Sequence, residues 1–177
     1  MTLLFYLGQL AYFMLPAYIA NMMPVLGKSM LTTLAHPIDN KYVLGGKPLF
    51  GKNKTWRGLL LGIFGGMLTT FVQSHFTTPL NLVSYPEVWP LLGFTMGCGA
   101  LLGDLAKSFF KRRLSILPGK QWVPFDQIDF VIGALLLNAF VYWPGWTQIG
   151  AILLMSFGGH VFMNRIGYWI KLKQTPW

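Results

Sequence analysis

The chemistry that this sequence could perform depends on a small number of acidic side chains. Four of its five acidic residues, Asp39, Asp104, Asp126 and Asp129, lie in segments that also carry lysine or arginine. If PFDQIDF, residues 124–130, is helical, Asp126 and Asp129 lie one turn apart on the same face. Carboxylates this close repel one another unless a cation neutralises them. The pattern therefore predicts a cationic partner, either lysine or a metal ion.

Lysines also stand close to Asp104 in the sequence. In GDLAKSFFKRR, residues 103–113, a helix would put Asp104, Lys107, Ser108 and Lys111 on one face. One interpretation is a structural cluster of salt bridges. The other is a Mg²⁺ site, because this ion is commonly held by one or two carboxylates plus substrate phosphates. Asp104 lies more than one turn inside an apolar run, where an ionisable group favours a functional interpretation.

A basic, glycine-rich segment could supply the other half of a phosphate site. NKYVLGGKPLFGKNKTWRG, residues 40–58, has four glycines and five basic residues but no acidic one. Backbone N–H groups and cationic side chains of this kind can surround an anion. Gly46 to Lys52 matches most of a P-loop pattern, but Asn53 stands where serine or threonine is required and no strand is predicted before it. An ordinary basic loop beside a membrane is the alternative.

The elements that must position these residues are membrane helices. The sequence is 54% hydrophobic and 11% charged, with a mean hydropathy of +0.50, which excludes an ordinary soluble domain. Each apolar segment is near the roughly 20 residues that cross a bilayer. We expect an all-α integral membrane protein, a single membrane-embedded domain over residues 1–177, with two large cytoplasmic loops and about five transmembrane helices: 3–26, 57–76, 87–109, 127–143 and 146–168.

The basic residues predict the orientation. All 14 lie in or beside the first loop, around the third loop or near the C-terminus, and the second and fourth loops have none. Since basic residues favour the cytoplasmic side, we expect the N-terminus outside and the C-terminus in the cytoplasm. The net charge of +9 is confined to membrane-proximal loops. Anionic lipid and nucleotide phosphate explain it, so we expect no nucleic-acid partner.

Two segments together resemble a known family. GDLAKSFFKRRLSILPGKQWVPFDQIDFVIGAL, residues 103–135, and GGKPLFGKNKTWRG, residues 45–58, resemble the motifs of CDP-archaeol synthases, which are CTP:2,3-di-O-geranylgeranyl-sn-glycerol-1-phosphate cytidyltransferases. The first segment is also similar, more distantly, to the pattern of phosphatidate cytidylyltransferases. Those enzymes carry His-Gly-Gly where this chain has Lys120-Gln121-Trp122, and this departure points to the archaeal branch.

The resemblance implies a Mg²⁺-dependent nucleotidyltransferase that joins CMP from CTP to an isoprenoid ether-lipid phosphate and releases pyrophosphate. It implies a multi-pass protein of the cell membrane whose active site faces the cytoplasm. Asp104, Asp126 and Asp129 would coordinate the metal, and with Lys107 and Lys111 they would be the catalytic residues. The CTP and phosphate contacts would come from Asn40, Lys52, Lys54, Arg57, Lys107, Ser108, Lys111, Arg112 and Lys120.

Other functions remain alternatives on the residues alone. A small transporter for an anion or a divalent cation would also need charges within a membrane, but transporters usually have repeated halves and charges near the midplane. Here the charges gather at one interface. A non-catalytic scaffold with basic loops for acidic lipids would not explain three aspartates facing lysines. A phosphotransferase that uses CDP-lipids would carry an Asp-Gly-x2-Ala-Arg motif, which is absent.

Overall fold

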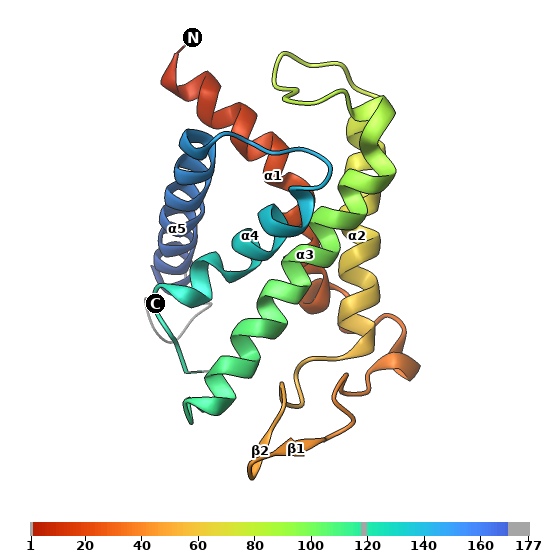
Figure 1. Cartoon of the computed structure of the whole chain (residues 1–177), viewed down its shortest axis with the longest axis vertical. Coiled ribbons are helices and arrows are strands. Elements are labelled where there is room, and N and C mark those ends of the chain that lie inside the picture. The colour runs from red at the N-terminus through yellow and green to blue at the C-terminus, as the bar shows by residue number, and fades with distance from the viewer. Residues whose placement is uncertain (1, 118–119, 170–177) are drawn as a thin grey trace.

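In its described residues, the protein is a bundle of five α-helices, whose arrangement is drawn in Figure 1. The computed structural model describes residues 2–117 and 120–169. Three of the helices, α1, α3 and α5, are long and apolar enough to cross a membrane. The predicted all-helical membrane architecture is therefore confirmed at this level. The helices are α1 (Leu3–Leu26), α2 (Trp56–Ser74), α3 (Tyr85–Arg113), α4 (Phe125–Asn138) and α5 (Trp146–Trp169).

Successive helices run in opposite directions, so the loops alternate between the two ends of the bundle. In Figure 1 the segments after α1 and α3 lie toward the lower end, and those after α2 and α4 lie toward the upper end. The first of these loops holds a short 3-10 helix (Thr32–Leu34) and an antiparallel hairpin of β1 (Val43–Leu44) and β2 (Lys47–Pro48). The sequence pattern does not predict this hairpin. The two basic segments consequently lie at the same end of the molecule.

Glycines allow α2, α3 and α4 to pack at the distance of backbone contact. A methyl group at Gly66 would lie 2.9 Å from the Cα atom of Gly97, and one at Gly103 would collide with the carbonyl oxygen of Asp129. Small residues of this kind let membrane helices approach closely. The interpretation of the glycine spacing as helix packing is confirmed for these positions. The close approach brings the two acid-bearing segments side by side.

Two helices differ in length from the prediction. α3 continues past the expected residue 109 to Arg113, so the whole basic run after Asp104 is helical. α4 ends at Asn138 and not at 143, because the Asn138 side chain donates to the carbonyl of Tyr142 at 3.0 Å and accepts from Thr95 at 3.0 Å. Its 14 residues span about 21 Å, which is shorter than the roughly 30 Å hydrocarbon layer.

Candidate active site

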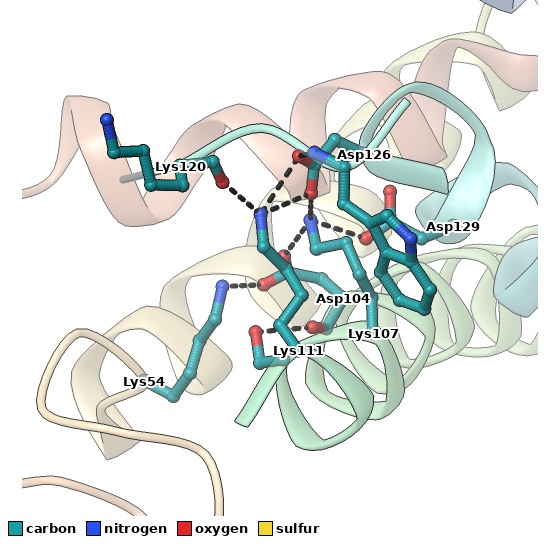
Figure 2. A network of polar contacts seen from close by, with 9 residues as sticks. Lys54, Asp104, Lys107, Lys111, Lys120, Asp126 and Asp129 are labelled. Carbon is teal, nitrogen blue, oxygen red and sulfur yellow. Dashed lines mark hydrogen bonds and ion pairs between the residues drawn. The ribbon is translucent and has the colours of Figure 1, made fainter. Parts of the chain in front are cut away.

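Lys107 is the centre of a compact group of charges at the end of α3. Its Nζ atom lies 3.0 Å from Asp104 Oδ1, 3.5 Å from Asp126 Oδ1 and 2.8 Å from Asp129 Oδ2 (Figure 2). Asp104 comes from the same helix one turn earlier, whereas Asp126 and Asp129 come from the first turns of α4. The structure therefore brings the three carboxylates of the two helix ends together around Lys107.

Two further lysines complete the group. Lys111 Nζ lies 3.0 and 2.9 Å from the two carboxylate oxygens of Asp126, and it also donates to the carbonyl of Lys120 at 2.5 Å. Lys54 reaches over from the first loop and pairs with Asp104. We call Lys54, Asp104, Lys107, Lys111, Asp126 and Asp129 the charge cluster. Its three carboxylates and three ammonium groups have opposite charges that sum to zero, so each charge of the cluster has a partner.

The charge cluster is largely shielded from solvent. The side chain of Asp129 is 7% exposed and that of Lys111 is 8% exposed. Buried charges are costly unless they are paired and hydrogen-bonded. Asp126 gains an additional bond of 2.6 Å from the backbone N–H of Trp122, which ties the loop after α3 to the start of α4. An anionic ligand that contacts these lysines would therefore have to replace some of their carboxylate partners.

A polar pocket of about 150 Å³ lies between the first loop and α3. Besides glycine, phenylalanine, asparagine and serine, its wall carries one acid, Asp126, against a set of basic side chains. This excess of positive charge suits a ligand with several negative charges. The basic side chains are Lys52, Lys54, Lys107, Lys111 and Arg112.

Asp39 fixes the shape of the first loop and does not take part in the charge cluster. Its carboxylate accepts hydrogen bonds from the backbone N–H groups of Lys41 at 3.1 Å, Phe50 at 2.9 Å and Gly51 at 3.0 Å. Burial alone would raise the pKa of Asp39, but these bonds outweigh it and hold the pKa below its usual value. Phe50, Gly51 and the adjacent Lys52 therefore line the polar pocket from a fixed backbone.

Arg113 and Lys47 lock the hairpin of this loop onto the end of α3. The Arg113 guanidinium donates to the carbonyls of Leu44, Lys47 at 2.9 Å and Pro48 at 2.6 Å. In return, Lys47 Nζ donates to the Arg113 carbonyl at 3.0 Å and to Ser115 Oγ at 2.6 Å. Sequence reasoning missed both roles, because the acceptors are mostly main-chain carbonyls that no residue type reveals. The two halves of the polar pocket are thus held together.

Four of the predicted phosphate-contacting residues lie differently from the expectation. Ser108 is buried and donates to the Asp104 carbonyl at 2.8 Å within its own helix, although it borders the polar pocket. Lys120 turns its ammonium away from the charge cluster and contributes only its carbonyl (Figure 2). Arg57 donates to the carbonyl of Lys28 at 2.6 Å, and Asn40 is exposed in a turn. Neither borders the polar pocket.

The expected metal site is not preformed. Within residues 2–117 and 120–169, no three His, Cys, Asp or Glu side chains are arranged to hold a metal ion. The ammonium of Lys107 holds the position between the three carboxylates instead. The donors are nevertheless hard carboxylate oxygens that already surround a cation, which is the chemistry that Mg²⁺ prefers. A site of one or two carboxylates completed by ligand phosphates fits these residues.

The fold and the charge cluster together define a helical membrane protein with a buried set of carboxylates and lysines at one end of its bundle. The family model described as CarS-like, CDP-archaeol synthase, matches residues 2–177. The chain belongs to the CDP-archaeol synthase family.

Individual relatives agree with this assignment. The CDP-archaeol synthase of Thermococcus onnurineus is 39% identical over 171 residues, with 94% of both chains covered. Those of Methanoregula boonei and Staphylothermus marinus are 37% and 34% identical, covering 93% and 95% of this chain and 100% and 91% of the relatives. A solved structure described as an intramembrane enzyme for archaeal membrane lipids biosynthesis superposes with a TM-score of 0.73, at 31% identity, over 87% of this chain and 91% of that one.

Proposed function

We propose that this chain is a CDP-archaeol synthase that transfers CMP from CTP to 2,3-di-O-geranylgeranyl-sn-glycerol 1-phosphate. Membership of the family supports the reaction. The observation that carries the site assignment is the polar pocket, where five basic side chains border the carboxylates of two helix ends. This excess of basic over acidic side chains suits two phosphate-bearing reactants and a leaving pyrophosphate.

The triphosphate of CTP is assigned to the polar pocket. Lys52 and Lys54 line it from the first loop, and Lys107, Lys111 and Arg112 line it from α3. Lysines act as point charges for phosphate, and an arginine side chain can bind two phosphate oxygens at once. The hairpin lock by Arg113 keeps the two walls in register. We assign no role in nucleotide contact to Asn40, Arg57 or the ammonium of Lys120.

Mg²⁺ is assigned to the carboxylates of Asp104, Asp126 and Asp129, of which one or two would bind the ion together with phosphate oxygens. When bound, the ion supplies charge neutralisation on the triphosphate. Lys107 lies within 3.5 Å of all three carboxylates. With phosphates bound, its ammonium would contact phosphate oxygens in place of some of these carboxylate oxygens.

The reaction needs no dedicated general base. An oxygen of the lipid phosphate forms a bond to the α-phosphorus of CTP while the bond from that phosphorus to the bridging oxygen of the β-phosphate breaks. Pyrophosphate leaves with the electron pair. A phosphate monoester has a second pKa of about 6, so its oxygen is already deprotonated near neutral pH. The lysines contribute by screening repulsion between the two anions and by stabilising charge on the leaving group.

The membrane arrangement is proposed to have five crossings, with the N-terminus outside and the C-terminus in the cytoplasm. The alternation of loops between the ends of the bundle and the gathering of basic loops at one end support it (Figure 1). Because α4 is short, the segment that follows Asn138 would complete its crossing, while α4 itself rests on α3 along its length. The charge cluster would then face the cytoplasm, where CTP is present. The chain would form a single catalytic domain embedded in the cell membrane.

Pyrophosphate release by purified protein in detergent tests the proposal. We expect release that requires CTP, Mg²⁺ and digeranylgeranylglyceryl phosphate together, with little release when ATP replaces CTP, when phosphatidate replaces the ether lipid, or when EDTA is added. Thermal unfolding of the same preparation establishes that it is folded. Folded protein that releases no pyrophosphate would contradict the assignment, and ion-flux measurements in vesicles would then test the transporter alternative.

A further inference from the structure

We propose that the groove between α1 and α2 binds a neutral lipid whose hydroxyl group donates a hydrogen bond to Gln73. The inference rests on the membrane arrangement proposed above and does not depend on the reaction. This α1–α2 groove has a volume of about 550 Å³, which is within the range of about 300–1,000 Å³ for ligand pockets. Its apolar walls include Leu15 and Ile19 of α1 and Phe64 and Leu68 of α2.

The polar end of the groove lies far from the charge cluster. Lys54 of the charge cluster precedes the start of α2, whereas Gln73 lies next to its last residue, Ser74. A rise of 1.5 Å per residue separates Gln73 from Trp56 by about 26 Å along α2. In the proposed orientation Gln73 is therefore near the outer surface of the membrane. The lipid that reaches it would belong to the outer leaflet.

Gln73 carries a buried acceptor that lacks a donor. Its side chain is part of the groove wall, and the residue is 3% exposed. The Nε2 atom donates to the carbonyl of Tyr12 at 2.7 Å, and this bond determines which end of the amide is the oxygen. Within the described residues, the Oε1 atom is buried and has no hydrogen-bond partner. A buried acceptor of this kind is unfavourable until a donor reaches it.

The chemistry of the groove selects an uncharged donor. An ionised phosphate and an ether oxygen only accept hydrogen bonds, whereas a hydroxyl group can donate one to Gln73. The described lining of the groove includes no Lys, Arg, Asp or Glu, so an ionised headgroup would have no charged partner there. Tyr12 also lines the groove next to Gln73, and its hydroxyl can donate or accept a second bond. A lipid alcohol meets these requirements.

The long side of the groove is open to the surroundings of the bundle. Phe64 is 60% exposed and Phe76 is 59% exposed, although both line it. On α1 the lining runs from Tyr12 to Met23, which a rise of 1.5 Å per residue converts to about 17 Å. That is about half of a 30 Å hydrocarbon layer. A lipid chain can therefore enter sideways from the bilayer and lie along the groove within one leaflet.

The groove between α1 and α5 lacks the unsatisfied acceptor. Its volume is about 700 Å³, and its lining includes the polar side chains of Tyr18 and Ser156. These two hydroxyl groups bond to each other at 2.7 Å. In the described part of the chain, no buried side-chain nitrogen or oxygen of this lining is without a hydrogen-bond partner. Size and polar residues therefore do not select a groove, and the Oε1 atom of Gln73 distinguishes the α1–α2 groove.

A pair of ligands that differ in one donor tests the inference on the unaltered protein. Diphytanylglycerol carries a free hydroxyl group, and its O-methyl ether has the same chains without the donor. Each is titrated onto the protein in detergent, and the Kd is measured by native mass spectrometry. We expect the alcohol to bind about tenfold more tightly than the methyl ether, because only the alcohol can donate to Gln73. Equal affinities would overturn the inference.

Variants of the groove locate the bound lipid. Leu68→Trp narrows the α1–α2 groove, and Leu154→Trp is a matched control at a side chain of α5 that is 76% exposed. We expect Leu68→Trp to weaken binding of the alcohol about tenfold, and Leu154→Trp to leave it unchanged. Gln73→Met keeps the length of the side chain and removes the acceptor, so the alcohol and the methyl ether should bind it equally. Equal losses in the two tryptophan variants would contradict the proposed location.

Photolabelling maps the site without any substitution. Diphytanylglycerol with a diazirine in one chain is photolysed on the wild-type protein, and the labelled peptides are identified by mass spectrometry. We expect labels on residues 12–23 and 64–76, and labels confined to α3, α4 or α5 would overturn the inference. These readouts measure binding and not turnover. Wild-type protein that binds the alcohol but shows no CTP-dependent pyrophosphate release would contradict the proposed function and leave the inference supported.

Discussion

The helix pair α3–α4 and the helix α5 differ sharply in how they pack. Gly99, Gly103 and Gly133 bring α3 and α4 to backbone contact, and a methyl group at any of them would collide with the facing helix. On α5, methyl groups at Gly150 and Gly158 would meet nothing within 4 Å. Of the apolar stretch of α5, 17% is buried in the chain, compared with 44% of that of α3.

The difference indicates where position matters for chemistry. Contact between backbones leaves little freedom for α3 and α4 to slide, so the carboxylates of Asp126 and Asp129 stay within 3.5 Å of Lys107. α5 supports the bundle through contacts such as the 2.7 Å hydrogen bond between Tyr18 and Ser156, and it carries no member of the charge cluster. The two regions should therefore respond very differently to the same substitution.

Removing the central lysine should have the largest effect. We expect Lys107→Met to lower kcat about 10²- to 10³-fold, because it removes a cation between reacting phosphates. It should also lower Tm, since three buried carboxylates lose a shared partner. The ammonium of Lys120 points away from the charge cluster (Figure 2). Lys120→Met should therefore lower kcat less than tenfold. Steady-state pyrophosphate release below the Tm of each variant checks this, and equal losses would remove Lys107 from its central role.

The glycine comparison is expected to give the next largest effect. Gly103→Ala places a methyl group against the Asp129 carbonyl, which should cost about 1–3 kcal/mol of unfolding free energy and displace Asp129 from Lys107. In a chain of this size each kcal/mol corresponds to about 2–4 °C in Tm. Gly158→Ala on α5 should leave Tm and activity unchanged or slightly raise Tm. Thermal unfolding in detergent and turnover measure both, and equal destabilisation would contradict the distinction between the two regions.

Removing the hydrogen bonds from Arg113 to the hairpin should act mainly on nucleotide binding. Arg113→Ala removes three hydrogen bonds between the first loop and the end of α3. We expect KM for CTP to rise about tenfold, which corresponds to about 1.4 kcal/mol, with kcat changed less than threefold. Arg113→Lys should recover part of the loss, because one ammonium can replace some of these bonds. A fall in kcat with an unchanged KM would indicate a different role.

Substitution of Asp39 is expected to have the smallest effect. The stability of the first loop, which Asp39 supports, should also depend on pH. Asp39→Ala should loosen the first loop, increase its cleavage by protease and raise KM for CTP a few-fold. In the wild type the native pKa of Asp39 lies below its unfolded value of about 3.9. Its stabilisation is therefore complete above the unfolded pKa and is lost as pH falls through the lower native pKa. Protease cleavage of the loop at pH 7 and near pH 3 should differ less in Asp39→Ala than in the wild type.

The helical part of the site follows directly from residue spacing. Asp104, Lys107 and Lys111 at i, i+3 and i+7 share a face only if the chain stays helical, and α3 does so to Arg113. Asp126 and Asp129 at i and i+3 meet them because glycines bring α4 against α3. Periodicity and small-residue spacing therefore suffice to predict which of these charges meet.

The loops are less predictable, because main-chain atoms decide their structure. The Lys120 carbonyl, and not its ammonium, contacts Lys111, and the Arg113 side chain binds main-chain oxygens of the hairpin. No residue type marks a carbonyl acceptor, so a basic residue that binds phosphate and one that binds backbone look the same in a sequence. α4 also ends early, because the polar Asn138 binds the turn that follows.

The most direct test of the account is the turnover of Asp129→Asn. Asn keeps the shape of the side chain and removes the charge, and Lys107 retains Asp104 and Asp126 as partners. We predict that CTP- and lipid-dependent pyrophosphate release falls at least 100-fold, while Tm stays within a few degrees of wild type. Release at a near-wild-type rate from the folded variant would contradict the claim that the charge cluster is the catalytic centre.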